Sequence, residues 1–370
     1  MIRILELFGG IGAIRKAFER ENIPHKVIDY VEIDKYAVKS YNAMFNENFE
    51  VQDITTWNKD IDVDFIMHGS PCQDFSVAGK QAGGDLGSGT RSSLMYETIR
   101  IVGKLRPKYV MWENVKNLLS KKHKHNFDAY IETMNILGYN SYYQVLNAKD
   151  YGIPQNRERV YTISIRKDID KGDFRFPEKE DLKLRLKDML EDEVDKKYYL
   201  SEKMKDYILD NNDSQKGTKW DGRADNDVLN PNIAHALSVR GAGGSQRAGV
   251  SNFIIDDIDG EIKVKDLKKQ IQVVGKLNIK GQDIIKRVYS PNGIAPSLTS
   301  MQGGNRQPKI LLSDIKIRKL TPKECWRIMG FGDEDFEKAQ GVPTSNTQLY
   351  KQAGNSIVVN VLEKILLNLF

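Results

Sequence analysis

The chain has 370 residues, of which 40% are hydrophobic and 29% charged, with a formal net charge of +5. This composition is typical of a soluble globular protein long enough for two domains, and the small positive charge permits a polyanionic partner without requiring one. The two cysteines, Cys72 and Cys325, argue against a disulfide framework. With Arg3 interrupting the apolar start and no run of about 18 apolar residues, the sequence predicts a cytoplasmic protein with neither signal peptide nor membrane span.

Through the first half of the chain, apolar runs of strand length alternate with segments of helical spacing. Strands are expected at 2–8, 27–31, 63–67, 109–112, 141–147 and 159–165, with a short strand ending at Asp53, and helices at 13–21, 35–45, 96–105 and 124–137. This alternation predicts an α/β fold with a doubly wound, mostly parallel sheet. Ligands of such sheets bind beyond the carboxyl ends of the strands. The glycine turn at 9–12, Glu32, Asp53, Cys72 and Glu113 all fall there.

Three short segments indicate a pocket for adenosine. The glycine turn at 9–12 is as typical of a tight strand-to-helix connection as of a nucleotide site. Glu32 lies 20 residues after Gly12, the spacing at which an acidic side chain reaches ribose hydroxyls. Ile33 is suited to pack on adenine and Asp53 to accept from its amine, although each carboxylate alone is more typical of a solvated loop. Because no lysine motif for a triphosphate is present, S-adenosylmethionine and NAD remain equally open.

Cys72 lies in the segment Gly-Ser-Pro-Cys-Gln-Asp-Phe-Ser, residues 69–76, directly after an expected strand. A cysteine there, after a proline that fixes φ, is well placed to act as a nucleophile. A lone intracellular cysteine is nevertheless more often a small buried hydrophobe. The segment 79–91 that follows holds five glycines in 13 residues, which is typical of a mobile lid or of a flexible surface loop.

Eight motifs in a fixed order give the chain a recognisable pattern. They are Glu-Leu-Phe-Gly-Gly-Ile-Gly at 6–12, Glu-Ile-Asp at 32–34, Asp-Ile at 53–54, Pro-Cys-Gln-Asp-Phe-Ser at 71–76, Glu-Asn-Val at 113–115, Gln-Asn-Arg-Glu-Arg at 155–159, Arg-Lys-Leu-Thr-Pro-Lys-Glu-Cys at 318–325 and Gln-Ala-Gly-Asn-Ser at 352–356. Together they resemble the DNA (cytosine-5)-methyltransferases of bacterial and phage restriction–modification systems. The resemblance covers nearly the whole chain except its middle. Ala13 and Glu6, where the family often has glycine and aspartate, are conservative departures.

The resemblance implies that a methyl group passes from S-adenosylmethionine to C5 of a cytosine flipped out of double-stranded DNA. It implies that the Cys72 thiolate adds to C6, that Glu113 acts at N3 and that Arg159 holds O2. Arg157 is either catalytic or part of a salt bridge at the start of its strand. The implied cofactor-binding residues are Phe8, Gly10, Gly12, Glu32, Ile33, Asp53, Ile54, Asn355 and Ser356. No metal is expected.

DNA contacts are expected from both halves of the chain. Similar enzymes close the 79–91 loop over DNA, which makes Gln73, Ser76 and Arg91 candidates for backbone contacts or for filling the vacated stack. In the second half, segments 233–238 and 294–299 resemble each other and each leads to paired glycines, which favours a small β-rich recognition domain. The candidates there for base edges or phosphates are Arg240, Gln246, Arg247, Lys280, Arg306 and Gln307.

The remaining segments suggest how the domains are built. The charged stretch 178–197 is expected to be a solvated helix, and Thr321 and Glu324 have the spacing of a capping box. The tail from residue 355 carries an apolar helical stripe that should pack on the first domain. We therefore expect a catalytic, S-adenosylmethionine-binding domain from 1–185 and 341–370, with a target-recognition domain at 186–340.

Three alternatives to a DNA methyltransferase remain at this point: a tRNA methyltransferase of the same fold, a DNA-binding relative without catalysis, and a nicotinamide oxidoreductase. The last would account for the first 60 residues only. The expected partner is double-stranded DNA in the cytoplasm or nucleoid of a bacterium, for a cellular or phage-encoded monomer. A cognate restriction endonuclease that acts separately is a possible further partner.

Overall fold

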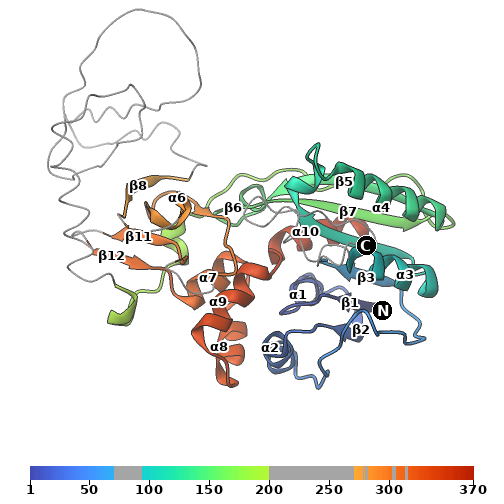
Figure 1. The fold of residues 1–370 in the computed structure, drawn as a ribbon, viewed down its shortest axis with the longest axis horizontal. Helices are drawn as coiled ribbons and strands as arrows, with labels where there is room; N and C mark the ends of the chain where they lie inside the picture. The colour runs from blue at the N-terminus through green and yellow to red at the C-terminus, as the bar shows by residue number, and fades with distance from the viewer. Residues whose placement is uncertain (71–93, 200–270, 278, 280–281, 302–305, 313–315) are drawn as a thin grey trace, which may run out of the picture.

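A six-stranded mixed sheet forms the centre of the first part of the chain (Figure 1). The computed structural model describes residues 1–70, 94–199, 271–277, 279, 282–301, 306–312 and 316–370. The strand order is β2 (His25–Val31), β1 (Ile2–Leu7), β3 (Phe65–His68), β4 (Tyr109–Val115), β7 (Glu158–Arg166) and β5 (Tyr139–Asn147). Strands β2, β1, β3 and β4 pair in parallel, whereas β7 runs antiparallel to both β4 and β5. The predicted α/β, mostly parallel fold is confirmed.

Helices cover both faces of this sheet. One face packs on α1 (Ala13–Arg20), α2 (Lys35–Phe45) and α10 (Val359–Leu369), and the other on α3 (Met95–Leu105) and α4 (Lys124–Ile136). Side chains alternate along each strand, so that Ile4 of β1 enters the first core and Leu5 the second. Burial on both faces explains why the strands read as nearly continuous apolar runs.

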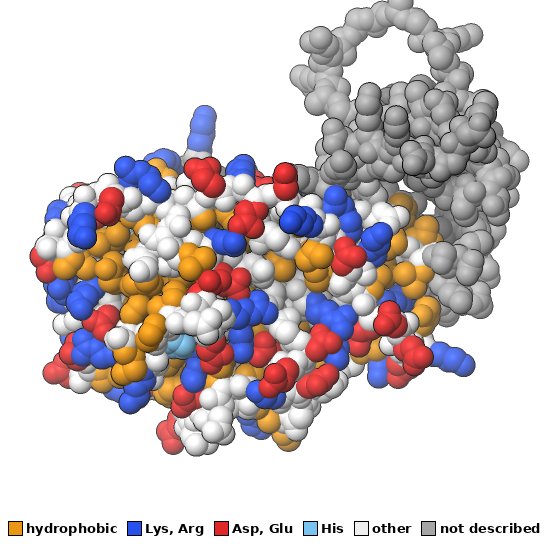
Figure 2. All heavy atoms as spheres, turned by 180° about the vertical axis from the view of Figure 1, so that it is seen from behind, with side chains coloured by type: hydrophobic (Ala, Val, Ile, Leu, Met, Phe, Trp, Pro, Cys, Tyr) orange, Lys and Arg blue, Asp and Glu red, His pale blue; other side chains and the backbone are white. Residues whose placement is uncertain are grey.

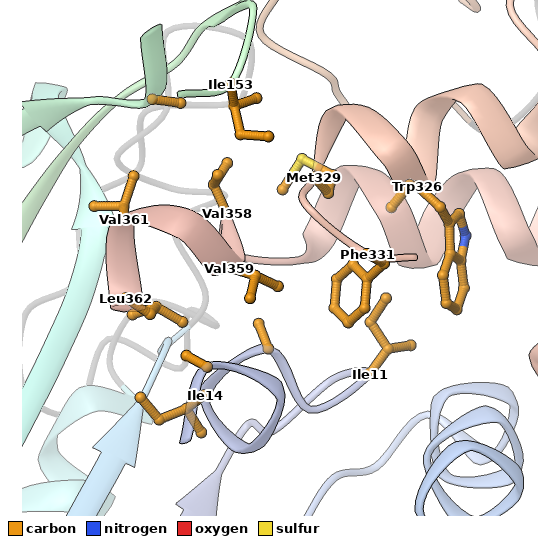
Figure 3. Packing of buried hydrophobic residues seen from close by; sticks show 14 of the residues in the cluster. Ile11, Ile14, Ile153, Trp326, Met329, Phe331, Val358, Val359, Val361 and Leu362 are labelled. Atoms are coloured by element: carbon orange, nitrogen blue, oxygen red, sulfur yellow. The ribbon is translucent and has the colours of Figure 1, made fainter. Parts of the chain in front are cut away.

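The end of the sequence completes the first core. Helix α10 packs against α1, and Figure 3 shows Val359 and Leu362 on the side of α10 that faces Ile11 and Ile14, while Val358 points toward Ile153. The predicted apolar stripe of this tail is therefore a core surface, as expected. Helices α7 (Pro322–Ile328), α8 (Asp333–Gly341) and α9 (Asn346–Asn355) lie between the two parts of the chain, and the predicted capping box at the start of α7 is present. None of the helices among the described residues is long and apolar enough to cross a membrane.

The described part of the second half has a smaller sheet of its own. Its order is β12 (Lys316–Lys319), β11 (Lys309–Leu312), β9 (Arg287–Tyr289) and β8 (Val273–Lys276), with α6 (Asp283–Lys286) beside it. Of the two similar segments in the sequence, only 294–299 is described. It supplies β10 (Ala295–Pro296), which pairs with β6 (Gln155–Asn156) rather than with the smaller sheet. The domain division remains a prediction, and α8, which it places in the recognition part, packs against α2.

Two of the expected elements differ from the structure. The charged stretch 178–197 is not a helix, because it contains only the 3₁₀ turns Leu186–Met189 and Lys196–Tyr198. Its Leu182, Leu186 and Met189 are buried in the core, so contacts with the rest of the molecule decide its path. No strand ends at Asp53 either, since the residues before it form no ladder with a neighbouring strand.

The contact between α9 and the segment after β10 leaves no space for a side chain at Gly354. A Cβ there would lie 1.8 Å from the carbonyl oxygen of Thr299. We expect Gly354→Ala to lower the free energy of unfolding by about 1–3 kcal/mol, because backbone must move to admit the methyl group. Urea denaturation measures this difference. The matched control is Gly341→Ala, whose Cβ meets no atom within 4 Å, and an equal effect of the two substitutions would contradict the prediction.

Candidate active site

A hollow lies at the carboxyl ends of β1, β3 and β4. Four segments that are distant in sequence line it: the turn after β1, Gly69 after β3, Glu113 of β4, and the stretch between α9 and α10. Its lining residues are Glu6, Leu7, Phe8, Gly9, Gly10, Ile11, Ala13, Ile14, Met67, Gly69, Glu113, Asn355, Ser356 and Ile357. The structure thus brings together Phe8, Gly10, Glu113, Asn355 and Ser356 from the predicted set.

The turn between β1 and α1 has a backbone that few residues adopt. Phe8, Gly10 and Gly12 have φ values of 53°, 55° and 75°. A Cβ on Gly12 would also lie 2.6 Å from the ring of Tyr41, so glycine is required there for two reasons. The result is a short turn that aims the amino-terminal end of α1 at the hollow, where backbone N–H groups favour anionic or polar ligand atoms.

The remaining predicted cofactor residues do not line the hollow, although Glu32 contacts its wall at Gly10. Glu32 accepts hydrogen bonds from the backbone N–H of Gly10 at 3.0 Å and of Asp34 at 2.8 Å, and burial raises the pKa of its carboxyl. Ile33 follows it with 67% of its surface exposed. Asp53 is also exposed and accepts from the backbone and hydroxyl of Thr55, whereas Ile54 is buried.

Glu113 and Arg159 form a close pair at the edge of the hollow. Arg159 Nε lies 3.1 Å from Glu113 Oε1, but the N–H does not point at this oxygen, which therefore has no hydrogen bond among the described residues. Burial raises the pKa of the Glu113 carboxyl, while the charges of Arg159 and Arg157 lower it. Glu113 lies in β4, which continues for two residues beyond it, past the predicted end of the strand. The alternation of β4 turns this carboxyl toward the hollow.

Arg157 has a different environment from its neighbour. It is buried, and its guanidinium donates to the backbone carbonyls of Leu298 at 2.9 Å, Gly354 at 3.2 Å and Ser356 at 2.8 Å. These contacts favour a structural role over the catalytic one proposed from sequence, since the guanidinium joins the segment after β10 to the wall of the hollow. The expected salt bridge at the start of the strand is not among these hydrogen bonds.

Glu6 was not predicted as a site residue, yet it lines the hollow. It is fully buried, its Oε1 accepts from the Tyr41 hydroxyl at 2.7 Å, and its Oε2 has no hydrogen bond among the described residues. Burial raises the pKa of the carboxyl to about 7, against the effect of Tyr41. The sequence signal was a charged residue inside an apolar run, on a strand buried on both faces.

Most of the predicted nucleophile and DNA-binding residues cannot be placed. Cys72, Gln73, Ser76, Arg91, Arg240, Gln246, Arg247 and Lys280 lie outside the described residues. Arg306 is exposed, and Gln307 donates from its amide to the carbonyl of Met301 at 3.1 Å. On the face shown in Figure 2, Lys and Arg side chains are interspersed with Asp and Glu over the described surface. No group of three His, Cys, Asp or Glu side chains in the described part could hold a metal ion.

A model of the C-5 cytosine-specific DNA methylase family matches residues 2–370. The chain belongs to this family. It is 33% identical over 371 residues to the type II methyltransferase M.HhaI of Haemophilus parahaemolyticus, covering 100% of this chain and 94% of the relative. It is also 33% identical over 435 residues to M2.ScrFI of Lactococcus lactis subsp. cremoris, covering 100% and 99%. The solved structure of the Schizosaccharomyces pombe Dnmt2 methyltransferase, at 18% identity and a TM-score of 0.63 over 100% of this chain and 98% of that one, supports the fold alone.

Family membership confirms the resemblance seen in the sequence motifs. The protein is a DNA cytosine-C5 methyltransferase, which excludes the nicotinamide oxidoreductase alternative. The hollow lined by the glycine turn, Glu113 and Asn355 is accordingly the candidate active site of this methyltransferase.

The raised pKa of Glu6 makes the stability of the free enzyme depend on pH. The folded protein keeps this proton up to a pH of about 7, and the ordinary value for glutamate is 4.5. The free energy of unfolding should therefore fall as pH rises between these values, by roughly 3 kcal/mol from this residue. Urea denaturation from pH 5 to 8 measures this effect. The free energy of unfolding should change less with pH in Glu6→Gln than in the wild type.

Glu47→Gln is the control for that experiment. Glu47 pairs with Arg15 at 2.9 Å, and Arg15 also acts on the charge of Glu6. Because the Glu47 side chain is about one-third exposed, the free energy of unfolding of the control variant should fall with rising pH as it does in the wild type. If the free energy of unfolding has the same pH dependence in Glu6→Gln and in the wild type, Glu6 is not the group responsible for it.

Proposed function

We propose that this methyltransferase moves the methyl group of S-adenosylmethionine to C5 of a cytosine extruded from double-stranded DNA, through a covalent bond between Cys72 and C6. The observation that carries the proposal is the shared hollow. It combines a glycine turn, a buried acid and the Asn355–Ser356 turn, and its wall includes Gly69, three residues before Cys72. These are the parts needed to hold a methyl donor beside a base and a nucleophile.

The donor set of the hollow fits S-adenosylmethionine. Phe8, Gly10, Gly12, Asn355 and Ser356 would surround its amino-acid portion, while Glu32, Ile33, Asp53 and Ile54 would hold its adenosine. The exposed apolar side chain of Ile33 suits an adenine ring, and the unpaired Oε2 of Glu6 suits a cationic group. When bound, this cofactor supplies an electrophilic methyl group on a sulfonium.

The proposed chemistry begins with a poor nucleophile, since C5 of cytosine does not by itself attack a methyl sulfonium. Addition of the Cys72 thiolate to C6 forms an S–C bond and moves the C5=C6 electron pair to C5. The C5 carbon would then accept the methyl group, with the electron pair of the broken bond left on the cofactor sulfur as a neutral thioether. A base next removes the C5 proton, so that the double bond re-forms and the Sγ–C6 bond breaks.

Glu113 and Arg159 are assigned to the ring atoms of the target base. A carboxyl whose pKa is raised by burial can keep a proton near neutral pH and place it on N3 as the thiolate adds. The adjacent guanidinium of Arg159 would hold O2 and stabilise charge that develops there. Arg157 acts on this site through position and charge rather than by contact with the base.

The segment 186–340 is proposed to read the target sequence, with 1–185 and 341–370 as the catalytic domain. Arg306, which is exposed, and the residues Arg240, Gln246, Arg247, Lys280 and Gln307 are the proposed contacts to base edges or phosphates. Gln73, Ser76 and Arg91 are proposed to contact the strand from which the base is extruded. A single flipped base needs one active site, so we propose a monomer that acts on DNA in the bacterial cytoplasm.

Cys72→Ala should abolish methyl transfer and leave the binding of S-adenosylmethionine and duplex DNA intact, because it removes only the group that activates C5. Tritium transfer from labelled cofactor and separate binding titrations measure the two properties. Cys325→Ala is the control. That thiol is fully buried and burial raises its pKa well above the ordinary value, so activity should remain. Turnover by Cys72→Ala would disprove the covalent route.

Duplex DNA with 5-fluorocytosine at the target position should form a lasting adduct with the enzyme. After methyl transfer C5 carries fluorine instead of a proton, so no base can restore the double bond and release the cysteine. Denaturing gel electrophoresis and mass spectrometry detect the adduct. The same oligonucleotide with Cys72→Ala should give none. If the wild-type enzyme methylates the cytosine duplex but is never trapped by the fluorinated one, the mechanism is wrong.

A further inference from the structure

The chain leaves β3 through Ser70, whose side chain and carbonyl are both held by β4. Trp112 Nε1 donates to the Ser70 hydroxyl at 3.0 Å, and the amide of Asn114 donates to the Ser70 carbonyl at 3.2 Å. All three residues are at least nine-tenths buried. Trp112 and Asn114 are two apart on one strand, so they project from the same face of the sheet. This face is the one opposite Glu113.

The indole of Trp112 is fixed by an aromatic cluster formed with His68, Phe127 and Tyr130. Its ring lies nearly parallel to that of His68, with a centroid distance of 5.6 Å and an angle of 7°, and it lies 4.2 Å from the ring of Tyr130. The Tyr130 hydroxyl and His68 Nε2 are 3.0 Å apart. Burial lowers the pKa of His68 to about 3, so this ring is uncharged at neutral pH. These ring contacts pack around the indole whose N–H donates to Ser70.

We propose that Trp112 is a positioning residue for the nucleophile, acting through its hydrogen bond to Ser70. This inference rests on the proposed role of Cys72. Ser70 precedes Pro71 and Cys72 directly. A residue before proline is confined to extended backbone, and proline fixes its own φ. Few free torsions therefore separate the anchored serine from the thiol, and an error in the orientation of Ser70 is passed on to Cys72.

The two hydrogen bonds hold different parts of Ser70, one its side-chain hydroxyl and the other its backbone carbonyl. Asn114 fixes the carbonyl, and a single bond would leave the residue free to turn about it. The indole adds a second point on the side chain, which sets the direction in which the chain continues. Displacement of a nucleophile by about 1 Å can slow a reaction by roughly a hundredfold. We expect a loss of about tenfold when the indole donor alone is removed, because Asn114 remains.

The experiment compares Trp112→Phe with the wild type in a single-turnover reaction on 5-fluorocytosine duplex. Phenylalanine keeps an aromatic ring in the cluster and lacks the N–H. The expected result is adduct formation about tenfold slower, with dissociation constants for S-adenosylmethionine and DNA within about twofold of the wild-type values. Ser70→Ala should show the same loss, and Ser70→Thr, which keeps the hydroxyl acceptor, should restore most of the rate.

Two further variants separate positioning from general damage to the cluster. Tyr130→Phe removes a hydroxyl from the same cluster without a contact to Ser70 and should keep the wild-type rate. The double variant Trp112→Phe with Ser70→Ala should be no slower than the slower single variant, because both changes break one bond. Losses that multiply in the double variant, or equal losses in Trp112→Phe and Tyr130→Phe, would overturn the inference.

The outcome can be distinguished from failure of the proposed function. A wild-type enzyme that forms no adduct would refute the covalent mechanism itself. A wild-type enzyme that forms the adduct, together with a Trp112→Phe variant of the same rate, would refute only the role of the indole. A parallel loss of rate and of cofactor affinity in Trp112→Phe would show a purely structural role and would also overturn the inference.

Discussion

The buried guanidinium of Arg157 holds the candidate active site together. It donates to three backbone carbonyls, one at Leu298 and two at Gly354 and Ser356. It thereby joins the connection between β6 and β7 to the segment after β10 and to the end of α9. Backbone carbonyls that end a helix or leave a short strand need partners when they are buried. A guanidinium holds its N–H donors in one rigid plane, whereas the three donors of a lysine ammonium rotate at the end of a flexible stem. Without the guanidinium, the wall that carries Asn355 and Ser356 would lose the hydrogen bonds that link it through Arg157 to the segment after β10.

The same cation also affects the chemistry of the hollow. Its charge and that of Arg159 lower the pKa of the Glu113 carboxyl, and burial raises it with a larger effect. The carboxyl is thus held between two opposing influences, with an oxygen that has no hydrogen bond among the described residues. A second buried acid, Glu6, lies on the wall of the same hollow. Two acids with raised pKa values at one sheet edge are typical of a functional site.

Much of this arrangement could be predicted from the sequence because it depends on local patterns. Alternation of apolar runs and helical spacing located the strands and helices of the first half, and the glycine turn and Glu113 were placed at the correct edge. The strand ending at Asp53 and the helix over 178–197 were predicted wrongly, because the paths of these segments depend on contacts that spacing does not reveal. The buried Leu182 is one such contact. The three carbonyl partners of Arg157 are also invisible in sequence, since they lie 141, 197 and 199 residues away.

The position of α10 has a consequence for how the enzyme is made. Ser356 forms part of the pocket wall, and the helix that follows it fills the core beside α1, where the ring of Phe370 lies 5.8 Å from that of Phe18. A ribosome delivers these residues after every strand of the central sheet. The nascent chain can thus form most of its sheet before residues 355–369, which complete the pocket wall and the first core, have been synthesised.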